Sequence, residues 1–367
     1  MARTRSPQPV AGPTLAVVAR EAGVSVPTAS KVVNGREDVA PETRRRVTEA
    51  LDRLGYVRRP RFTGARAPGL VDLVLHSLES SRSGAVLRGV EAAAYEAGLE
   101  VVVSAAPVRG PDAGLDAGPE QDRLDRLTAR GSSGVLFHLA ELSAAQYAWL
   151  DHHRIPYVLI DPAYEPPAQV VSVGAANWQG GVCATEHLLE LGHERIGVIA
   201  GHRRTMDGEA RLAGYRSALA SAGVRLRPEY VRHAGSDETS ARLRTHELLD
   251  LPEPPTALFV CADRMALGVY TALAEREVRV PEEMSVVGFD DLPEARWAAP
   301  ALTTVRQPLA EIGATALRLL VRMTHGERPE GTRTELSTRL VRRASTAPPP
   351  AVRPRKYRPD PAERPTA

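Results

Sequence analysis

Apolar residues in the first 56 positions recur at the spacing of short amphipathic helices. The first helical stretch has four apolar residues on one face. The same pattern continues from Val26 to Asn34 and from Pro41 to Tyr56. In the last of these runs, Val47, Leu51 and Leu54 fall on one side. The apolar face of the first stretch consists of Leu15, Val18, Ala19 and Ala22. The pattern predicts three helices packed into one small unit.

From Leu70 onward the rhythm changes to short β-rich runs that alternate with helical stretches. One series reads LVDLVLHSL, LEVVVSAA, SGVLFHLA and YVLIDPA, and a second reads RIGVIAG, TALFVCAD and MSVVGFDD. Helical stretches are expected near 84–97, 120–130, 143–153, 177–191, 208–222, 237–250 and 264–276. This alternation is typical of parallel sheets with helices on both faces. Two such series predict an α/β body of two similar lobes, with a ligand between them at the carboxyl ends of the strands.

Three stretches show neither helical nor strand spacing. Residues 57–69, VRRPRFTGARAPG, contain prolines, glycines and arginines, which predicts a linker. Residues 107–119 are expected to form a surface loop within the first lobe. The proline-rich basic stretch after Pro348 predicts a disordered tail.

Charge is distributed unevenly along the chain. Residues 1–69 hold 13 Lys and Arg against 6 Asp and Glu, a net charge of +7, whereas the whole chain of 367 residues carries only +2. A basic head on an acidic body indicates that the head meets a polyanion. The N-terminal stretch lacks the apolar core of a signal peptide, no stretch is long and apolar enough to span a membrane, and the two cysteines lie far apart. We therefore expect a cytoplasmic protein without a disulfide framework.

The run VAREAGVSVPTASKVVNG (18–35) has the local features of two short helices joined by a tight turn. Gly23 can supply the positive φ that ends the first helix, Ser25 can cap the second, and Pro27 is tolerated in its first turn. Val26, Pro27, Ser30 and Lys31 can then face outward. On a basic unit this arrangement favours a helix-turn-helix whose second helix enters a major groove. A purely structural three-helix cap is the alternative that these residues alone leave open.

The string TLAVVAREAGVSVPTASKVVNG, followed by VAPETRRRVTEALDRLGY, resembles the head of the LacI/GalR family of bacterial transcriptional regulators. The similarity continues in order through HLLELGHERIGVIAG, RLAGYRSAL, PTALFVCADRMALG, MSVVGFDD, LTTVRQP and LVRRAST. The resemblance implies a helix-turn-helix head, a two-lobed body like that of type I periplasmic binding proteins, and a homodimer that binds operator DNA and a small effector. The expected domains are a disordered 1–13, a DNA-binding 14–57, a hinge 58–69, an effector-binding and dimerisation body 70–347, and a disordered 348–367.

By similarity to the family, three outward residues read bases. Lys31 can donate to guanine O6 or N7, whereas Val26 and Pro27 offer only apolar contact. Other matching positions contact phosphates or cap helices, which sets register more than sequence. These other residues are Thr14, Ser25, Thr28, Ser30 and Asn34.

The linker departs from the family pattern. Members commonly place a leucine wedge in the minor groove here, but by position it falls on Ala65, and Phe62 is the only large apolar candidate. Arg58, Arg59 and Arg61 can instead enter a narrow minor groove or bind phosphate, as can Arg66. A charged flexible tether is an equally weighted alternative, and we expect a hinge that is poorly helical without DNA.

The resemblance also implies an effector site between the lobes. The family's cleft positions fall on Ser77, Asp161, Arg211, Asp263, Asp290 and Gln307. Of these, Arg211 suits bidentate acceptors and Asp290 suits paired hydroxyls. Structural alternatives are a surface role for Arg211 and a turn cap for Asp290. Ala262 stands where members often have an amide, so the effector is expected only to be a carbohydrate by family association.

Other functional classes are disfavoured. The chain has no GxGxxG opening a helix after a strand, no GxxxxGK[ST] and no GxSxG, so neither an enzyme nor a cofactor is expected. His187 and His193 are spaced poorly for a metal site. A solute-binding protein without DNA function is the main alternative, and the basic head argues against it. The partners expected are operator DNA, a small effector and a second copy of the chain, with no membrane.

Overall fold

The computed structural model describes residues 14–33, 36, 38–54, 56, 69–105, 121–203, 205–327 and 329–350. The chain divides into a small unit, residues 1–67, and a large unit, residues 68–367. The expected disordered N-terminus, the expected surface loop 107–119, and most of the expected hinge and tail lie outside the described residues. So do the predicted residues Asn34, Arg58, Arg59, Arg61, Phe62 and Arg66.

The small unit contains three helices, α1 (Leu15–Glu21), α2 (Val26–Val33) and α3 (Pro41–Leu54). Their inner faces form one apolar core, made by Val18, Ala19, Ala22, Ala29, Val32, Val47 and Ala50. Gly23 has a φ of +62°, a left-handed conformation that lets the chain leave α1 and turn into α2. The three-helix head predicted from the apolar spacing is therefore present.

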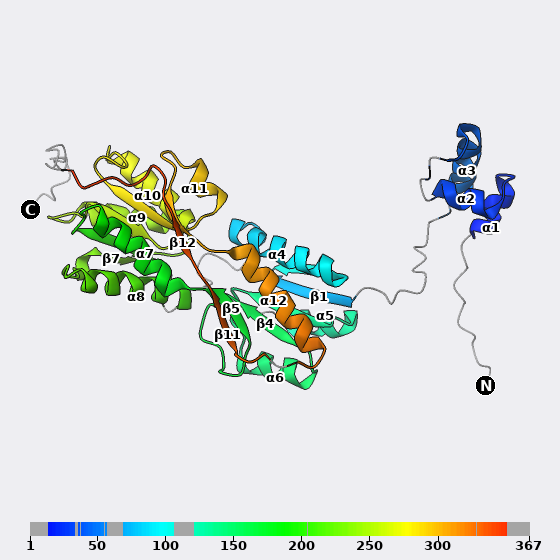
Figure 1. Ribbon diagram of the computed structural model, residues 1–367, viewed down its shortest axis with the longest axis horizontal. Coiled ribbons are helices and arrows are strands. Elements are labelled where there is room, and N and C mark those ends of the chain that lie inside the picture. Colours follow the sequence, from blue (N-terminus) through cyan, green and yellow to red (C-terminus); the bar gives the residue numbers. More distant parts are fainter. Residues whose placement is uncertain are drawn as a thin grey trace, which may run out of the picture. The chain divides into compact units, whose positions relative to one another are not determined.

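The first lobe of the large unit is built on a parallel six-stranded sheet in the order β11-β5-β4-β3-β1-β2. One face is covered by α4 (Ser81–Ala97) and α12 (Leu309–Thr324), and the other by α5 (Gln121–Arg130) and α6 (Ala144–His152) (Figure 1). The strands are β1 (Gly69–Leu75), β2 (Leu99–Ala105), β3 (Gly134–His138), β4 (Tyr157–Ile160), β5 (Ser172–Ala175) and β11 (Arg333–Leu336).

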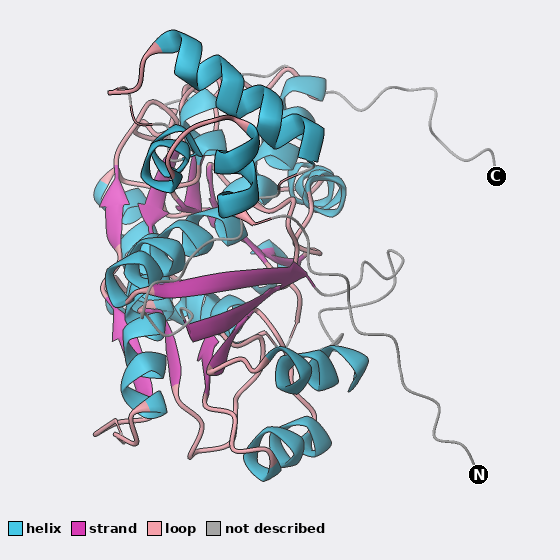
Figure 2. Ribbon diagram, turned by 90° about the vertical axis from the view of Figure 1, so that its right-hand side faces the viewer, coloured by secondary structure: helices cyan, strands magenta, loops and turns pink. Residues whose placement is uncertain are grey.

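The second lobe repeats this plan around a sheet in the order β12-β10-β9-β8-β6-β7, in which only β12 runs antiparallel to its neighbour. Helices again cover both faces, with α7 (Asn177–Glu190) and α8 (Met206–Ser221) on one side and α9 (Glu238–Leu249) and α10 (Asp263–Glu275) on the other. Figure 2 shows strands of the large unit (magenta) flanked by helices (cyan). The strands are β6 (Ile196–Ala200), β7 (Val231–His233), β8 (Ala257–Val260), β9 (Ser285–Asp290), β10 (Thr303–Arg306) and β12 (Arg339–Val341). Two short helices, η1 (Pro228–Tyr230) and α11 (Pro293–Trp297), complete it.

The chain passes between the lobes three times. It crosses from β5 to α7, from β10 back to α12, and from β11 to β12 (Figure 1). Each lobe therefore contains segments that are far apart in the sequence. The crossings place the carboxyl ends of β4, β5, β9 and β10 beside one another, where the candidate site lies.

Glycines allow the major helix pairs to approach closely. A Cβ at Gly89 of α4 would lie 1.7 Å from the carbonyl oxygen of Ala310 in α12. A Cβ at Gly214 of α8 would lie 2.2 Å from the carbonyl oxygen of Trp178 in α7. These contacts require glycine because no side chain fits between the backbones.

The two-lobed α/β body confirms the fold class predicted from the sequence. The apolar pattern did not predict β5, β7, β10, β11 or β12, which are three or four residues long. Among the described helices, none is long and apolar enough to cross a bilayer.

Candidate functional site

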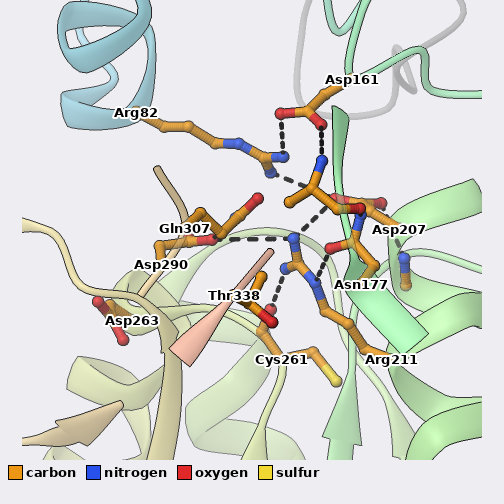
Figure 3. Close-up of polar contacts among 12 residues, drawn as sticks. Arg82, Asp161, Asn177, Asp207, Arg211, Cys261, Asp263, Asp290, Gln307 and Thr338 are labelled. Atoms are coloured by element: carbon orange, nitrogen blue, oxygen red, sulfur yellow. Dashed lines mark hydrogen bonds and ion pairs between the residues drawn. The ribbon is translucent and has the colours of Figure 1, made fainter. Parts of the chain in front are cut away.

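A cluster of charged side chains lies between the lobes (Figure 3). Arg82, in the first turn of α4, bonds through Nη2 to Asp161 Oδ2 of the same lobe at 2.9 Å. Its Nη1 bonds to Asp207 Oδ2 in α8 of the second lobe at 3.2 Å. Burial acts to lower the pKa of Arg82, but the charges of Asp161, Asp290 and Asp207 outweigh it and raise the pKa. Arg82 is thus a buried, permanently charged link between the two lobes.

Arg211 occupies the second lobe's side of the cluster and is only 2% exposed. Its Nε donates to Asn177 Oδ1 at 2.8 Å, and its Nη1 donates to the carbonyl oxygen of Cys261 at 2.6 Å. The guanidinium also lies over the Phe289 ring, 3.9 Å from its centroid. Partners on three sides fix the plane of the guanidinium and leave Nη2 directed at the carboxylates (Figure 3).

Two carboxylates share the remaining edge of Arg211. Its Nη2 lies 3.5 Å from Asp207 Oδ2 and 3.8 Å from Asp290 Oδ1. Burial would raise the pKa of Asp207, but Arg211 and Arg82 lower it, so this carboxylate is ionised. For Asp290 burial dominates and raises the pKa despite the two arginines. Asp290 also accepts a hydrogen bond from Gln307 Nε2 and has a φ of +121°, which directs its carboxylate into the cluster.

Several buried polar atoms of this region have no hydrogen-bond partner. Gln307 Oε1 is an open acceptor and Arg82 Nε is an open donor, while Arg211 Nη2 has only its two long ion pairs with Asp207 and Asp290. His138 Nε2, at the end of β3, is also unpaired, and burial together with Arg82 lowers the pKa of this histidine well below its usual value. Unpaired buried groups are costly, so a polar ligand that paired with them would bind favourably here. Open donors and open acceptors that lie close together suit hydroxyl groups, because a hydroxyl group can both donate and accept a hydrogen bond.

A pocket of about 280 Å³ opens beside the cluster. Asp161, Asn177 and Asp207 line it together with Trp178, which is 44% exposed in the first turn of α7. Segments 162–175 and 332–335 form the remaining walls, to which Met206 and Ala210 add apolar surface. The pocket thus combines carboxylates with an aromatic side chain.

The structure brings together four of the six predicted effector residues, namely Asp161, Arg211, Asp290 and Gln307. Ser77 lies in the loop after β1, where its Oγ accepts from the Glu79 amide at 3.2 Å. Asp263 is fully buried and accepts hydrogen bonds from Thr304 Oγ1 at 2.6 Å and the Leu292 amide at 2.9 Å. These contacts make Asp263 a support for the loop after Asp290.

Sequence reasoning missed Arg82 and Asp207. Asp207 precedes Arg211 by four residues on one helix, a spacing that brings opposite charges together, so this signal was available. Arg82 lies in the polar stretch SSRSG, and its partner Asp161 is 79 residues away. No local pattern reveals a contact of that kind.

In the head, the second helix presents the predicted face to solvent. Val26 is 45% exposed, Pro27 and Lys31 are also exposed, and Ala29 and Val32 point into the core. Ser25 Oγ accepts from the Thr28 amide at 3.3 Å and bonds to Thr28 Oγ1 at 2.8 Å, so both residues help to begin α2. Thr14 precedes α1 without a side-chain capping bond, and Ser30 is half-buried.

Comparisons with known proteins match this architecture. A family model described as bacterial regulatory proteins, lacI family, matches residues 14–59, and a periplasmic binding protein-like domain matches residues 185–346. The HTH-type transcriptional regulator CelR of Thermobifida fusca is 36% identical over 343 residues, which are 91% of this chain and 98% of that protein.

Solved structures of regulators show the same arrangement. A transcriptional regulator CelR–cellobiose complex has a TM-score of 0.66 and 34% identity, and it covers 91% of this chain and 99% of its own. A lac repressor dimer bound to operator and the anti-inducer ONPF has a TM-score of 0.69 and 28% identity, covering 92% and 100%.

Proposed function

Because the chain belongs to the LacI family of bacterial regulatory proteins, and is thus a DNA-binding transcriptional regulator and not an enzyme, we propose that it is a carbohydrate-responsive repressor. The observation that carries the proposal is the buried interlobe cluster of Arg82, Asp161, Asp207, Arg211 and Asp290, with its unpaired donors and acceptors. The proposed place of action is the cytoplasm, where the DNA is. As in the lac repressor dimer, the functional unit would be two copies on a near-palindromic operator.

Two or more linked sugar rings are the proposed effector. Hydroxyls of one ring would satisfy Gln307 Oε1 and the open guanidinium donors of the cluster. A second ring would occupy the adjacent pocket with its apolar face against Trp178. The similarity to a regulator in complex with cellobiose favours a ligand of this size. Ser77 remains a predicted rim contact, and Asp263 would act through the loop after Asp290.

Effector and operator would be coupled through the arrangement of the lobes. Arg82 bridges Asp161 of the first lobe and Asp207 of the second. A ligand that replaces one of these contacts with its own therefore changes which arrangement of the lobes is favoured. By linkage, the effector then alters operator affinity by the same factor that the operator alters effector affinity. Alternative contacts of Arg82 are thus the proposed physical basis of control.

Fluorescence anisotropy with a labelled palindromic site near the protein's own gene tests this function. We expect binding to weaken steeply with salt, because several phosphate contacts release counterions. We expect a disaccharide from a screened panel to change operator affinity by about 5- to 150-fold. A protein that binds no DNA at low salt, with and without the sugars, would refute the proposal.

Replacing Trp178 by alanine is expected to weaken effector binding about tenfold, or about 1.4 kcal/mol, because the aromatic surface of the pocket is lost. Half of this side chain is already exposed, so folding should change little. Calorimetric titration of the wild type, Trp178→Ala and Trp178→Phe measures the effect. Phenylalanine keeps an aromatic face and should restore most of the affinity, and equal affinities for all three proteins would remove Trp178 from the site.

A further inference from the structure

An acidic side chain lies on the face of the head that is proposed to meet DNA. Asp38, in the loop between α2 and α3, bonds through Oδ2 to Nζ of Lys31 at 2.7 Å. The two side chains are 59% and 51% exposed. The hydrogen bond from Lys31 lowers the pKa of Asp38, which is therefore ionised. The phosphates of DNA repel a carboxylate, so there must be a reason why Asp38 lies on a DNA-binding surface.

Stability does not supply that reason. Exposed ion pairs contribute little to folding, because water screens them and the side chains lose freedom. Arg36, two residues before Asp38, is already held to α2 through its backbone, since its amide donates to the Lys31 carbonyl at 3.0 Å. Arg44 Nη2 also donates to the Arg36 carbonyl at 2.6 Å. Asp38 thus lies two residues after a position that other bonds already hold next to the last turn of the proposed recognition helix.

The pair presents a donor directly beside an acceptor. In the major groove, a G·C pair offers the acceptors N7 and O6 of guanine next to the N4 amino donor of cytosine. The ammonium of Lys31 can face both guanine acceptors while the carboxylate of Asp38 accepts from cytosine N4. An A·T pair offers an ammonium no such pair of adjacent acceptors.

We propose that Asp38 is a specificity-determining residue that, together with Lys31, reads one G·C pair through both of its bases. The proposal rests on the proposed function, in which α2 enters the major groove. Lysine alone contacts guanine as a single charge without the fixed fork of arginine. Asp38 supplies the missing directionality by fixing the ammonium and adding a contact that only cytosine satisfies.

The same pair suppresses binding to non-cognate DNA. Where no G·C pair is presented, Lys31 stays bonded to Asp38 and contacts no phosphate, and the carboxylate opposes the backbone charge. Removing the carboxylate frees Lys31 to neutralise one phosphate. The slope of log affinity against log salt on random DNA should then become more negative by about 0.9.

The test uses the full chain with Asp38→Asn, Lys31→Ala and the double variant, on the operator and on operators with each base pair replaced in turn. Asp38→Asn should lose about tenfold discrimination at one G·C position and bind random duplex more tightly, with the steeper salt slope. The Lys31→Ala substitution should cause a loss at the same position. The double variant should lose no more than either single variant, because the two residues act as a unit.

Glu21→Gln is the matched control, since Glu21 forms an exposed ion pair with Arg53 at 2.8 Å in the same head. It should change affinity equally for all sequences and leave base preference intact. Unchanged base preference in Asp38→Asn, additive losses in the double variant, or a loss at an A·T position would overturn the reading by Asp38. A wild-type protein that binds no DNA overturns the proposed function, and this inference with it.

Discussion

Replacing Arg211 by methionine is expected to abolish effector binding and to destabilise the body by about 3–5 kcal/mol. The guanidinium serves Asn177, the Cys261 carbonyl and two carboxylates from a position that is 2% exposed. Methionine fills a similar length but leaves the buried Asp290 and the partly buried Asp207 without this cation, and removing one partner of a buried pair carries a penalty of that size. Thermal unfolding should show the body melting about 10 °C earlier.

Arg216→Met provides the control for this substitution. Arg216 lies on the same helix, α8, but faces solvent, so its replacement should leave both unfolding and effector titration unchanged. The helix-turn-helix head is a separate unit, and both variants should still bind DNA. If Arg211→Met bound the effector with wild-type affinity, the interlobe cluster would not be the effector site.

The second large effect is expected from Gly89→Ala, which should destabilise the first lobe by about 3 kcal/mol. The new methyl group would lie 1.7 Å from the Ala310 carbonyl oxygen, so α4 and α12 must move apart. The destabilisation is expected at the upper end of the range that is usual for overpacking. The reason is that the atom in the way belongs to the backbone and not to a flexible side chain. Denaturant unfolding of the full chain measures the change.

Gly84→Ala on the same helix separates overpacking from any general effect of alanine. A Cβ at Gly84 meets nothing within 4 Å. Alanine is the better helix former by up to about 1 kcal/mol, so this variant should be neutral or slightly more stable. Equal destabilisation by both substitutions would contradict the role assigned to the close approach of the two helices.

Alternation of strands and helices was enough to predict the class of fold, because fully buried strands such as β8, ALFV, are continuous apolar runs. The strands that were not predicted are too short to show a clear pattern of apolar and polar residues. Strand β11 is four residues long and alternates exposed with half-buried positions, RTEL, and β5 contains a glycine. Their pairing depends on crossings of the chain that no local pattern encodes.

Prediction of the site was limited in the same way. Arg211 and Asp290 were predicted from family positions, and their role in effector binding stays a prediction. The 2% exposure of Arg211 removes the alternative of a surface arginine, and Asp290 lies 3.8 Å from it. The next residue, Asp291, pairs with Arg306 and Arg343. Arg82 and Asp38 were missed because each becomes meaningful only beside a partner that folding brings to it.

The three crossings also bear on how the chain folds while it is being synthesised. The head can form its own core as soon as α3 emerges from the ribosome. The first lobe cannot, because α12, which covers one face of its sheet, ends at Thr324, whereas β4 ends at Ile160. At about 5–20 residues per second, the part of that face that α4 does not cover stays exposed for roughly 8 to 33 s. The body is therefore exposed to premature association during translation, and chaperones that shield apolar strands should act on this protein before α12 has emerged from the ribosome.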